Sequence, residues 1–326
     1  LQGLRGAFGD NWDWDTAVLY MKAERDEVTH DRVSNSLMWE ALYDPTPAAY
    51  NPFADENPAN TNIERALVDV YRNNETELAL IDFKLSTPSL VNLWGRDIGF
   101  LAGAEYRYES FVDDRDPRLD GTIQFTYRDG TTFPYVSDVL NSSPTADNEG
   151  DRNVTSLFTE FAIPLFEHED IQLAARYENF SDVGSTVVPK VAFGWTPTEW
   201  FMLRGSWSEA FRAPNLITVY VSLVVRSNTN DDWLCQYVQD NSDTPEAADL
   251  DCSYNMQRRA RGSKHLDPEK STNQSIGVVL SPIPQLTMTI DFWKIEKKDT
   301  IGLFGEENHL LYDLLFYLDD AGACAT

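Results

Sequence analysis

The chain has 326 residues, of which 53 are acidic and 26 are basic, giving a formal net charge of −27. A surface this acidic repels phosphate backbones, which argues against nucleic acid as a partner. No run of about 18 apolar residues occurs, which excludes transmembrane helices and leaves transmembrane strands open.

The two ends of the chain indicate a piece of a longer protein. The sequence opens on Leu1 and stops at Thr326, without a signal peptide. Its length allows one large β domain or two smaller domains. The mean hydropathy of −0.40 fits a soluble protein, and it fits equally a barrel with one wet face and long loops.

Alternation of apolar and polar residues at every second position is the dominant pattern. Ile171, Leu173 and Ala175 share one face of a segment whose other face carries Gln172 and Arg176. In each such segment one face of the strand core carries no charge. The pattern predicts about ten strands of about the length that crosses a bilayer obliquely. In chain order the predicted strands are 1–8, 12–26, 77–86, 97–112, 153–166, 171–181, 186–196, 200–208, 271–281 and 286–298.

The connections between these strands alternate in length. Starting from 9–11, every second connection is a tight turn, and the other side has long loops at 27–76, 113–152 and 209–270, with 182–185 as a short exception. Short turns on one side and long loops on the other are typical of an outer-membrane barrel. Aromatic residues gather toward both ends of the predicted strands. This placement fits the aromatic belts that transmembrane barrels have at the level of the lipid headgroups, and the alternative is the ordinary preference of aromatic residues for strands. These aromatic residues are Trp12, Trp14, Trp195 and Trp200 near the short turns, and Tyr106, Tyr108, Tyr177 and Trp207 toward the long loops.

Three cysteines and one apolar cluster mark the later loops. Cys235 and Cys252 lie in one polar stretch, a spacing that indicates a local disulfide in an oxidising compartment, with three unpaired thiols as the alternative. Cys324 is left over, and we expect its partner beyond the end of the chain. The leucine spacing in 308–320 predicts a loop helix.

The segment Leu203–Leu216, with the sequence LRGSWSEAFRAPNL, resembles a stretch of TonB-dependent outer-membrane receptors. In that family a strand rises to the cell surface and ends in Phe-Arg-Ala-Pro. The resemblance covers nearly the whole chain and is strongest from about 153 to 301. The other similar segments are 175–214, 266–282 and 289–301, with shorter pieces at 102–110 and 50–53.

The resemblance implies an all-β fold, the antiparallel wall of a transmembrane barrel with about ten of the family's roughly 22 strands. It implies one partial barrel domain over 1–326, without the plug domain, the energy-coupling peptide or the C-terminal strands. The implied function is active uptake of a scarce nutrient, which could be an iron chelate, cobalamin or an oligosaccharide. The implied partners are outer-membrane lipid, lipopolysaccharide, a small-molecule or oligosaccharide ligand, and the TonB energy-coupling complex acting through the missing N-terminal region.

The resemblance also places a rim motif of four residues, Phe211, Arg212, Ala213 and Pro214, at the cell surface. Pro214 lacks an N–H and fixes its φ angle, so we expect the strand ladder to stop there. Arg212 has donors suited to tying loop carbonyls or carboxylates together, and a ligand contact is the alternative role. On the expected inner face, charged residues fit ladder pairs, plug contacts or ligand contacts; they are Glu105, Arg107, Glu109, Arg176, Glu178, Lys190, Arg204 and Asp291.

The loop 209–270 supplies the candidate ligand contacts. Aromatic residues lie around the two cysteines, and a rare positive run follows them, which could capture an anionic ligand such as a carboxylate-bearing chelate or an acidic sugar. The alternative is a solvated stretch that balances nearby acidic residues. The candidate substrate-binding residues are Trp233, Tyr237, Tyr254, Arg258, Arg259 and Arg261.

Two other classes of protein stay open at this point. A soluble secreted β-rich enzyme or lectin acting on glycans would use the carboxylates and loop aromatics, and a passive porin would share the barrel without a plug. No catalytic motif, metal-ligand spacing or phosphate-binding glycine loop is present, so we expect no enzyme activity, metal or cofactor.

Overall fold

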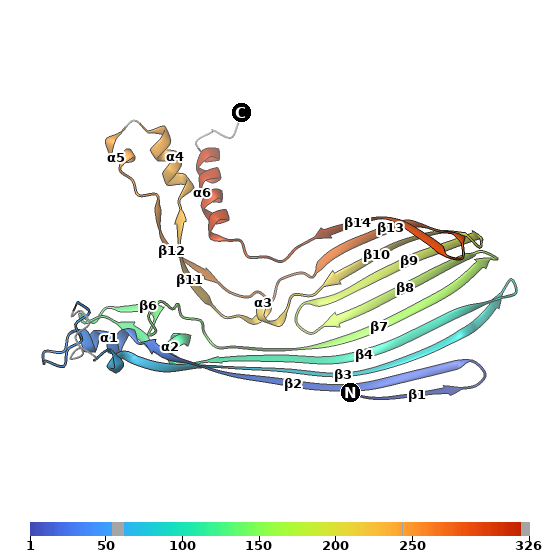
Figure 1. Ribbon diagram of the computed structural model, residues 1–326, viewed down its shortest axis with the longest axis horizontal. Coiled ribbons are helices and arrows are strands. Elements are labelled where there is room, and N and C mark those ends of the chain that lie inside the picture. Colours follow the sequence, from blue (N-terminus) through green and yellow to red (C-terminus); the bar gives the residue numbers. More distant parts are fainter. Residues whose placement is uncertain (54–61, 243, 321–326) are drawn as a thin grey trace.

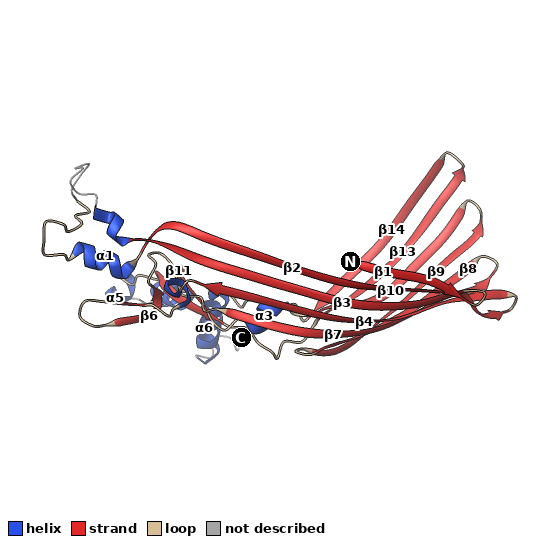
Figure 2. Ribbon diagram, turned by 90° about the horizontal axis from the view of Figure 1, so that it is seen from below, coloured by secondary structure: helices blue, strands red, loops and turns tan. Residues whose placement is uncertain are grey.

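The computed structural model describes residues 1–53, 62–242 and 244–320. Its main element is a ten-stranded antiparallel sheet in which each strand lies beside its predecessor (Figures 1 and 2). Figure 1 shows short turns at one end of this long curved sheet and the helices at the other. The strands are β1 (Gln2–Phe8), β2 (Trp12–Val33), β3 (Leu67–Leu93), β4 (Arg96–Arg115), β7 (Asn148–Phe166), β8 (Glu169–Phe180), β9 (Gly184–Thr198), β10 (Phe201–Arg212), β13 (Glu269–Ile283) and β14 (Leu286–Lys298).

The sheet is open rather than closed on itself. Among the described residues, β1 pairs only with β2, and β14 pairs only with β13. Each of these two strands therefore has one free edge. No helix in the described part of the chain is long and apolar enough to cross a membrane.

All ten predicted strands are present, which confirms the fold class. The bounds differ most at β2 and β3, which are 22 and 27 residues long and pair through Arg25↔Asn74 and Asp26↔Asn73. These extensions carry polar residues on both faces, so they show no alternation, although the backbone ladder continues through them. The predicted loop 209–270 also contains a separate hairpin, β11 (Val224–Asp231) with β12 (Ser253–Ala260).

One face of the sheet has an apolar band. Ile81 of β3 lies opposite Val18 of β2 and Tyr106 of β4, and the three side chains are 51, 52 and 48 % exposed. A continuous band of exposed apolar side chains fits contact with hydrocarbon. The band ends where the Tyr20 hydroxyl donates a hydrogen bond to Glu77 Oε1 at 3.1 Å.

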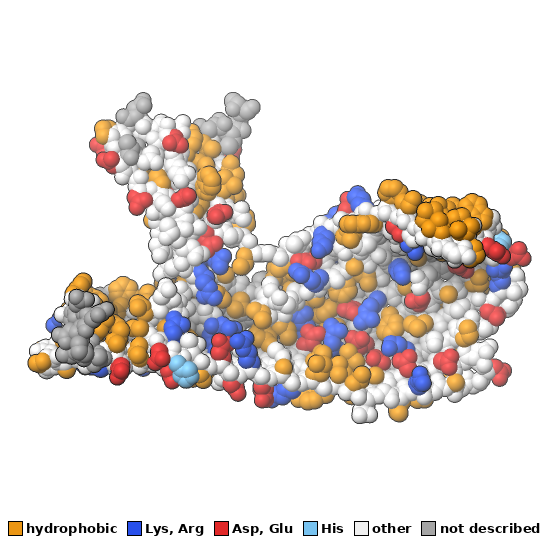
Figure 3. Space-filling view, in the orientation of Figure 1, with side chains coloured by type: hydrophobic (Ala, Val, Ile, Leu, Met, Phe, Trp, Pro, Cys, Tyr) orange, Lys and Arg blue, Asp and Glu red, His pale blue; other side chains and the backbone are white. Residues whose placement is uncertain are grey.

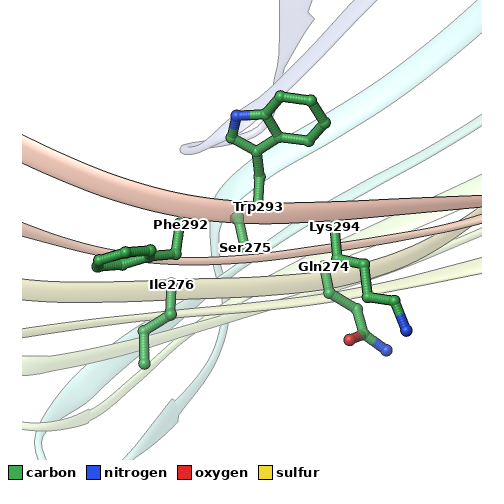
Figure 4. Close-up of a pocket in the computed structure, with 6 residues that line it drawn as sticks. All are labelled: Gln274, Ser275, Ile276, Phe292, Trp293 and Lys294. Atoms are coloured by element: carbon green, nitrogen blue, oxygen red, sulfur yellow. The ribbon is translucent and has the colours of Figure 1, made fainter.

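The free-edge hairpin β13–β14 shows the same boundary. A hollow of about 350 Å³ there is lined by Ile276 and Phe292 and, further along, by Gln274 and Lys294. Figure 4 shows Ile276 and Phe292 pointing to one side of the hairpin, and Trp293 to the other. This hollow lies on the apolar outer face at a strand edge, so it marks the membrane boundary and is no candidate for a polar ligand.

The opposite, inner face is charged. Arg107 on β4 contacts Glu105 at 3.0 Å and Glu109 at 2.5 Å. Arg204 on β10 forms a bidentate contact with Asp291 on β14 at 2.8–2.9 Å. Figure 3 shows acidic and basic side chains interspersed over the hollow of the sheet.

Two loop assemblies stand on the long-loop end of the sheet. The first, here called the distal module, comprises the described residues of 34–66 and residues 116–147. It contains α1 (Asn35–Leu42), η1 (Asn62–Ala66), α2 (Pro117–Asp120), β5 (Gln124–Thr126) and β6 (Thr132–Ser137). The second, here called the tower, contains β11, β12, α4 (Trp233–Asn241), α5 (Pro245–Ala248) and α6 (Glu306–Asp320). The predicted loop helix at 308–320 is thus confirmed as α6, which packs against α4.

Candidate functional site

The rim motif sits where β10 ends. The Phe211 ring packs edge-on against Phe180 with centroids 5.9 Å apart. Arg212 Nη2 donates to Glu269 Oε1 at 2.7 Å, and the same oxygen accepts the backbone N–H of Ile301 at 2.8 Å. The motif therefore joins the end of β10 to the loop that follows β14.

Behind the motif, residues 213–223 form a strap that contains α3 (Leu216–Tyr220). Arg152 Nη2 donates to the carbonyl of Pro214 at 2.7 Å and lies 3.2 Å from the Asp182 carboxylate. The Arg152 and Asp182 side chains are only 3 and 2 % exposed. A buried ion pair of this kind leaves an uncompensated charge if one partner is removed.

The strap lies on the inner wall above β7. Gly150 points to the same face as Arg152, and a Cβ at Gly150 would lie 2.6 Å from the Tyr220 ring. The Tyr220 hydroxyl donates to the carbonyl of Asp151 at 3.0 Å. On the other side of the strap, a Cβ at Gly262 would meet the Val219 carbonyl at 2.5 Å. Glycine at both positions therefore allows β7 on one side and the segment after β12 on the other to approach the strap closely.

A polar groove of about 490 Å³ opens beside the rim motif on the inner wall. Ala213 and Pro214 form one border, and the other is the charged ladder. In that ladder Arg176 Nε donates to Glu178 Oε1 at 2.5 Å. The arrangement places paired guanidinium and carboxylate groups on a wet inner surface, which suits a lumen for polar solutes.

The tower holds the candidate loop residues in separate places. Cys235 and Cys252 form a disulfide with Cα atoms 5.4 Å apart. The Tyr254 hydroxyl donates to Asp232 Oδ2 at 2.6 Å, and this bond raises the pKa of Tyr254. Asp232 also caps α4, directly before Trp233, whose side chain is 45 % exposed. Tyr237 packs instead against α6, through Tyr317.

The positive run is likewise divided among several partners. Arg258 forms an ion pair with Glu306 at 3.1 Å. The Arg259 guanidinium lies 3.7 Å from the centre of the Tyr135 ring in the distal module. Arg261 is exposed. The structure therefore does not bring these arginines together with Trp233 in one pocket.

The acidic residues at the end of β4 and directly after it are bound by neighbouring groups of the protein. Asp113 is bound by Arg72 at 2.7 Å and by Arg115 at 3.0 Å, and Asp116 caps α2. Within the described residues, no group of three or more histidine, cysteine, aspartate or glutamate side chains could hold a metal ion.

Residues that sequence reasoning missed lie mainly on the inner wall and between the two loop assemblies. They are Arg152, the strap, Arg115 and Arg226. The glycines at 150 and 262, each within a polar stretch, were the available signal of close backbone approach.

The sheet has an apolar outer face and a charged inner face, with tight turns at one end and long loops at the other. These features define the wall of a transmembrane β-barrel. The chain belongs to the TonB dependent receptor-like, beta-barrel family, whose model matches residues 1–310. Members of this family are bacterial outer-membrane proteins, and this chain is one of them.

Solved structures show the same fold. The ferric enterobactin receptor of Pseudomonas aeruginosa is 16 % identical, with a TM-score of 0.55 over 90 % of this chain and 34 % of that chain. The siderophore receptor PirA of Acinetobacter baumannii is also 16 % identical, with a TM-score of 0.51 over 89 % of this chain and 35 % of that chain. The chain thus spans about a third of each structure. No curated protein matches it in sequence.

Proposed function

We propose that this chain is part of the wall of an active transporter that takes up a scarce nutrient across the outer membrane. The two-faced sheet carries the proposal, because its apolar band suits lipid while its inner face is lined with paired charges. Outer-membrane lipid and lipopolysaccharide would contact the outer face. The TonB complex would supply energy through an N-terminal region outside this chain.

An iron chelate is the nutrient we propose first, ahead of cobalamin or an oligosaccharide. Two observations support it. The similar structures described above are named as a ferric enterobactin receptor and a siderophore receptor. The inner groove is lined by the partly exposed guanidinium groups of Arg107 and Arg176 and by the exposed Arg212, which suit an anionic chelate.

Uptake by cells tests the proposal. The full-length protein would be expressed in a strain that lacks its own iron-chelate receptors, and accumulation of radiolabelled ferric chelates would be measured with and without a functional TonB complex. We expect TonB-dependent accumulation of at least one chelate. Accumulation that does not need TonB would indicate a passive porin. Recovery of the full-length protein in the aqueous phase without detergent would indicate a soluble enzyme or lectin.

A further inference from the structure

A second polar groove, of about 600 Å³, lies between the distal module and the tower, and is here called the interloop groove. Its volume falls within the range of sites for small ligands, roughly 300–1,000 Å³. The distal module, with Arg115 at its base, forms one wall, and the tower forms the other. Arg115, Tyr135 and Thr145 are among the residues that line it on the first side, and Arg226 and Asn255 line it on the tower side.

Direct contacts hold the two walls together. Arg226 Nη1 donates to Thr145 Oγ1 at 3.2 Å, and Thr145 forms an isolated β-bridge with Val224. The Arg259 guanidinium covers the Tyr135 ring at 3.7 Å. The groove is therefore a built feature of the fold rather than a gap between independent loops.

The groove has a positive lining in a chain whose net charge is −27. None of the described residues that line it carries a carboxylate. Arg226 is exposed and forms no ion pair with any described residue. Arg115 shares the carboxylate of Asp113 with Arg72, and its backbone N–H donates to Asp147 at 2.8 Å. Arg226 is therefore the lining residue that brings a positive charge without a carboxylate partner among the described residues, and Arg115 adds guanidinium N–H donors.

The other lining groups favour hydrogen bonding over stacking. Hydroxyl and amide side chains are supplied by Asn141, Ser142, Ser143 and Asn255. Arg259 covers one face of the Tyr135 ring, so stacking of a sugar ring or a catechol is limited to the other face of this one aromatic residue among the described lining residues. A ligand rich in carboxylate and hydroxyl oxygens would satisfy these donors best.

We propose that the interloop groove binds an anionic, hydroxyl-rich carboxylate chelate and is the first contact of the nutrient on the cell-surface side. This inference rests on the proposed function and names the chemical class of its substrate. Arg226 would bind a ligand carboxylate, Arg115 would donate a hydrogen bond from the base of the groove, and Asn255 would donate from the tower.

Binding to the purified full-length receptor in detergent tests this inference separately from transport. Ferric citrate is the probe, and titration calorimetry is the measurement. We expect Arg226→Gln to raise the Kd by roughly tenfold or more, because a hydrogen bond to a charged group is lost. Asn255→Asp, an isosteric change on an exposed strand, would place a negative charge in the groove and weaken binding to a similar degree. Wild-type affinity should also fall as salt is added.

Arg25→Gln is the matched control, since it removes the same charge from β2 at a residue whose side chain is 71 % exposed and lies outside the groove. We expect it to bind ferric citrate as the wild type does. Wild-type affinity in both Arg226→Gln and Asn255→Asp would overturn the groove as the binding site. Binding of digalacturonate but not ferric citrate, with the same dependence on Arg226, would overturn the chelate class. Either result would count against this groove alone, because the proposed function is tested separately by TonB-dependent uptake in cells.

Discussion

Arg212 and Glu269 form an ion pair at 2.7 Å, in which the carboxylate is 12 % exposed and also accepts the N–H of Ile301. Arg212 of the rim motif thus holds the Glu269 carboxylate in place, and this carboxylate in turn holds the backbone of the loop after β14 at Ile301. Arg212 donates one of its five N–H groups to Glu269, which supports the tying role.

Arg212→Ala should loosen the start of the loop after β14 without unfolding the sheet. Because the guanidinium is 71 % exposed, we expect a loss of about 1 kcal/mol or less in local stability. Hydrogen exchange at the Ile301 amide should become faster, while amides in the middle of β10 stay protected. Unchanged exchange at Ile301 would contradict the clamp. Arg212→Lys, which keeps the charge but not the planar fork, should have an intermediate effect.

Arg152→Met should be far more damaging, because Asp182 would remain buried without its partner. Breaking one side of a buried pair costs about 3–5 kcal/mol, and Arg152 also loses its bond to Pro214. The measurement is the temperature at which the detergent-solubilised barrel unfolds. The double variant Arg152→Met with Asp182→Leu is the control, and it should recover most of the loss. Equal damage in the single and double variants would show that the ion pair is not the cause.

Asp138 should make the distal module sensitive to acid. Its carboxylate is fully buried and accepts hydrogen bonds from the Ser34 hydroxyl at 2.7 Å, the Ser36 N–H at 3.0 Å and the Arg118 guanidinium. Burial raises the pKa of Asp138, but these hydrogen bonds outweigh burial and lower it below 3.8. A lowered folded-state pKa means that this stabilisation is complete above about pH 4 and is lost as the pH falls through the folded pKa.

Hydrogen exchange at the Ser36 amide, followed from pH 7 downward and corrected for intrinsic rates, measures this effect. We expect protection in the wild type to fall below about pH 4. Asp138→Asn should lose protection at neutral pH and show no further acid step at this residue. An acid step of the same size in Asp138→Asn would assign it to another carboxylate.

The disulfide should stabilise the tower alone. Cys235 and Cys252 are 17 residues apart, and cross-linking a loop of that size contributes about 3 kcal/mol in the chain-entropy model. Replacing both with Ser, or reducing the pair, should increase hydrogen exchange in α4 and β12. The ten-stranded sheet should unfold at an unchanged temperature, because the tower hairpin pairs separately from it. A matching fall in barrel stability would contradict this independence.

Much of the sheet was predictable because lipid contact imposes a pattern on every second residue. Ile81 and Phe83 must be apolar, whereas Asp82 and Lys84 between them face the inner side, and this alternation is visible in sequence. The extensions of β2 and β3 were not predictable in the same way. Both of their faces are polar, and they are held by backbone pairing and by cross-strand polar contacts such as Arg72–Asp113 and His30–Asp69, which leave no alternating apolar pattern.

The candidate binding residues were harder to predict because long-range contacts assemble them. Arg152 reaches Pro214 across 62 residues, and Arg226 reaches Thr145 across 81. Neither arginine lies in a motif, and each resembles an ordinary solvated charge in its own segment. The positive run at 258–264 stood out by composition, yet its members pair with Glu306, Tyr135 and Tyr220 in different directions.

The outer face of β3 offers the most direct test of membrane contact. Ile81→Arg would place a charge in the apolar band, which costs about 2–4 kcal/mol at the middle of a bilayer. Leu78→Arg is the matched control, because this nearby residue faces the inner side and lies opposite Glu109. Folding of the full-length protein into lipid vesicles, followed by its heat-dependent mobility on gels, is the measurement. Ile81→Arg should reduce the folded fraction strongly, whereas Leu78→Arg should fold nearly as well as the wild type. Similar folded fractions for the two variants would mean that the row of Val18, Ile81 and Tyr106 does not contact hydrocarbon.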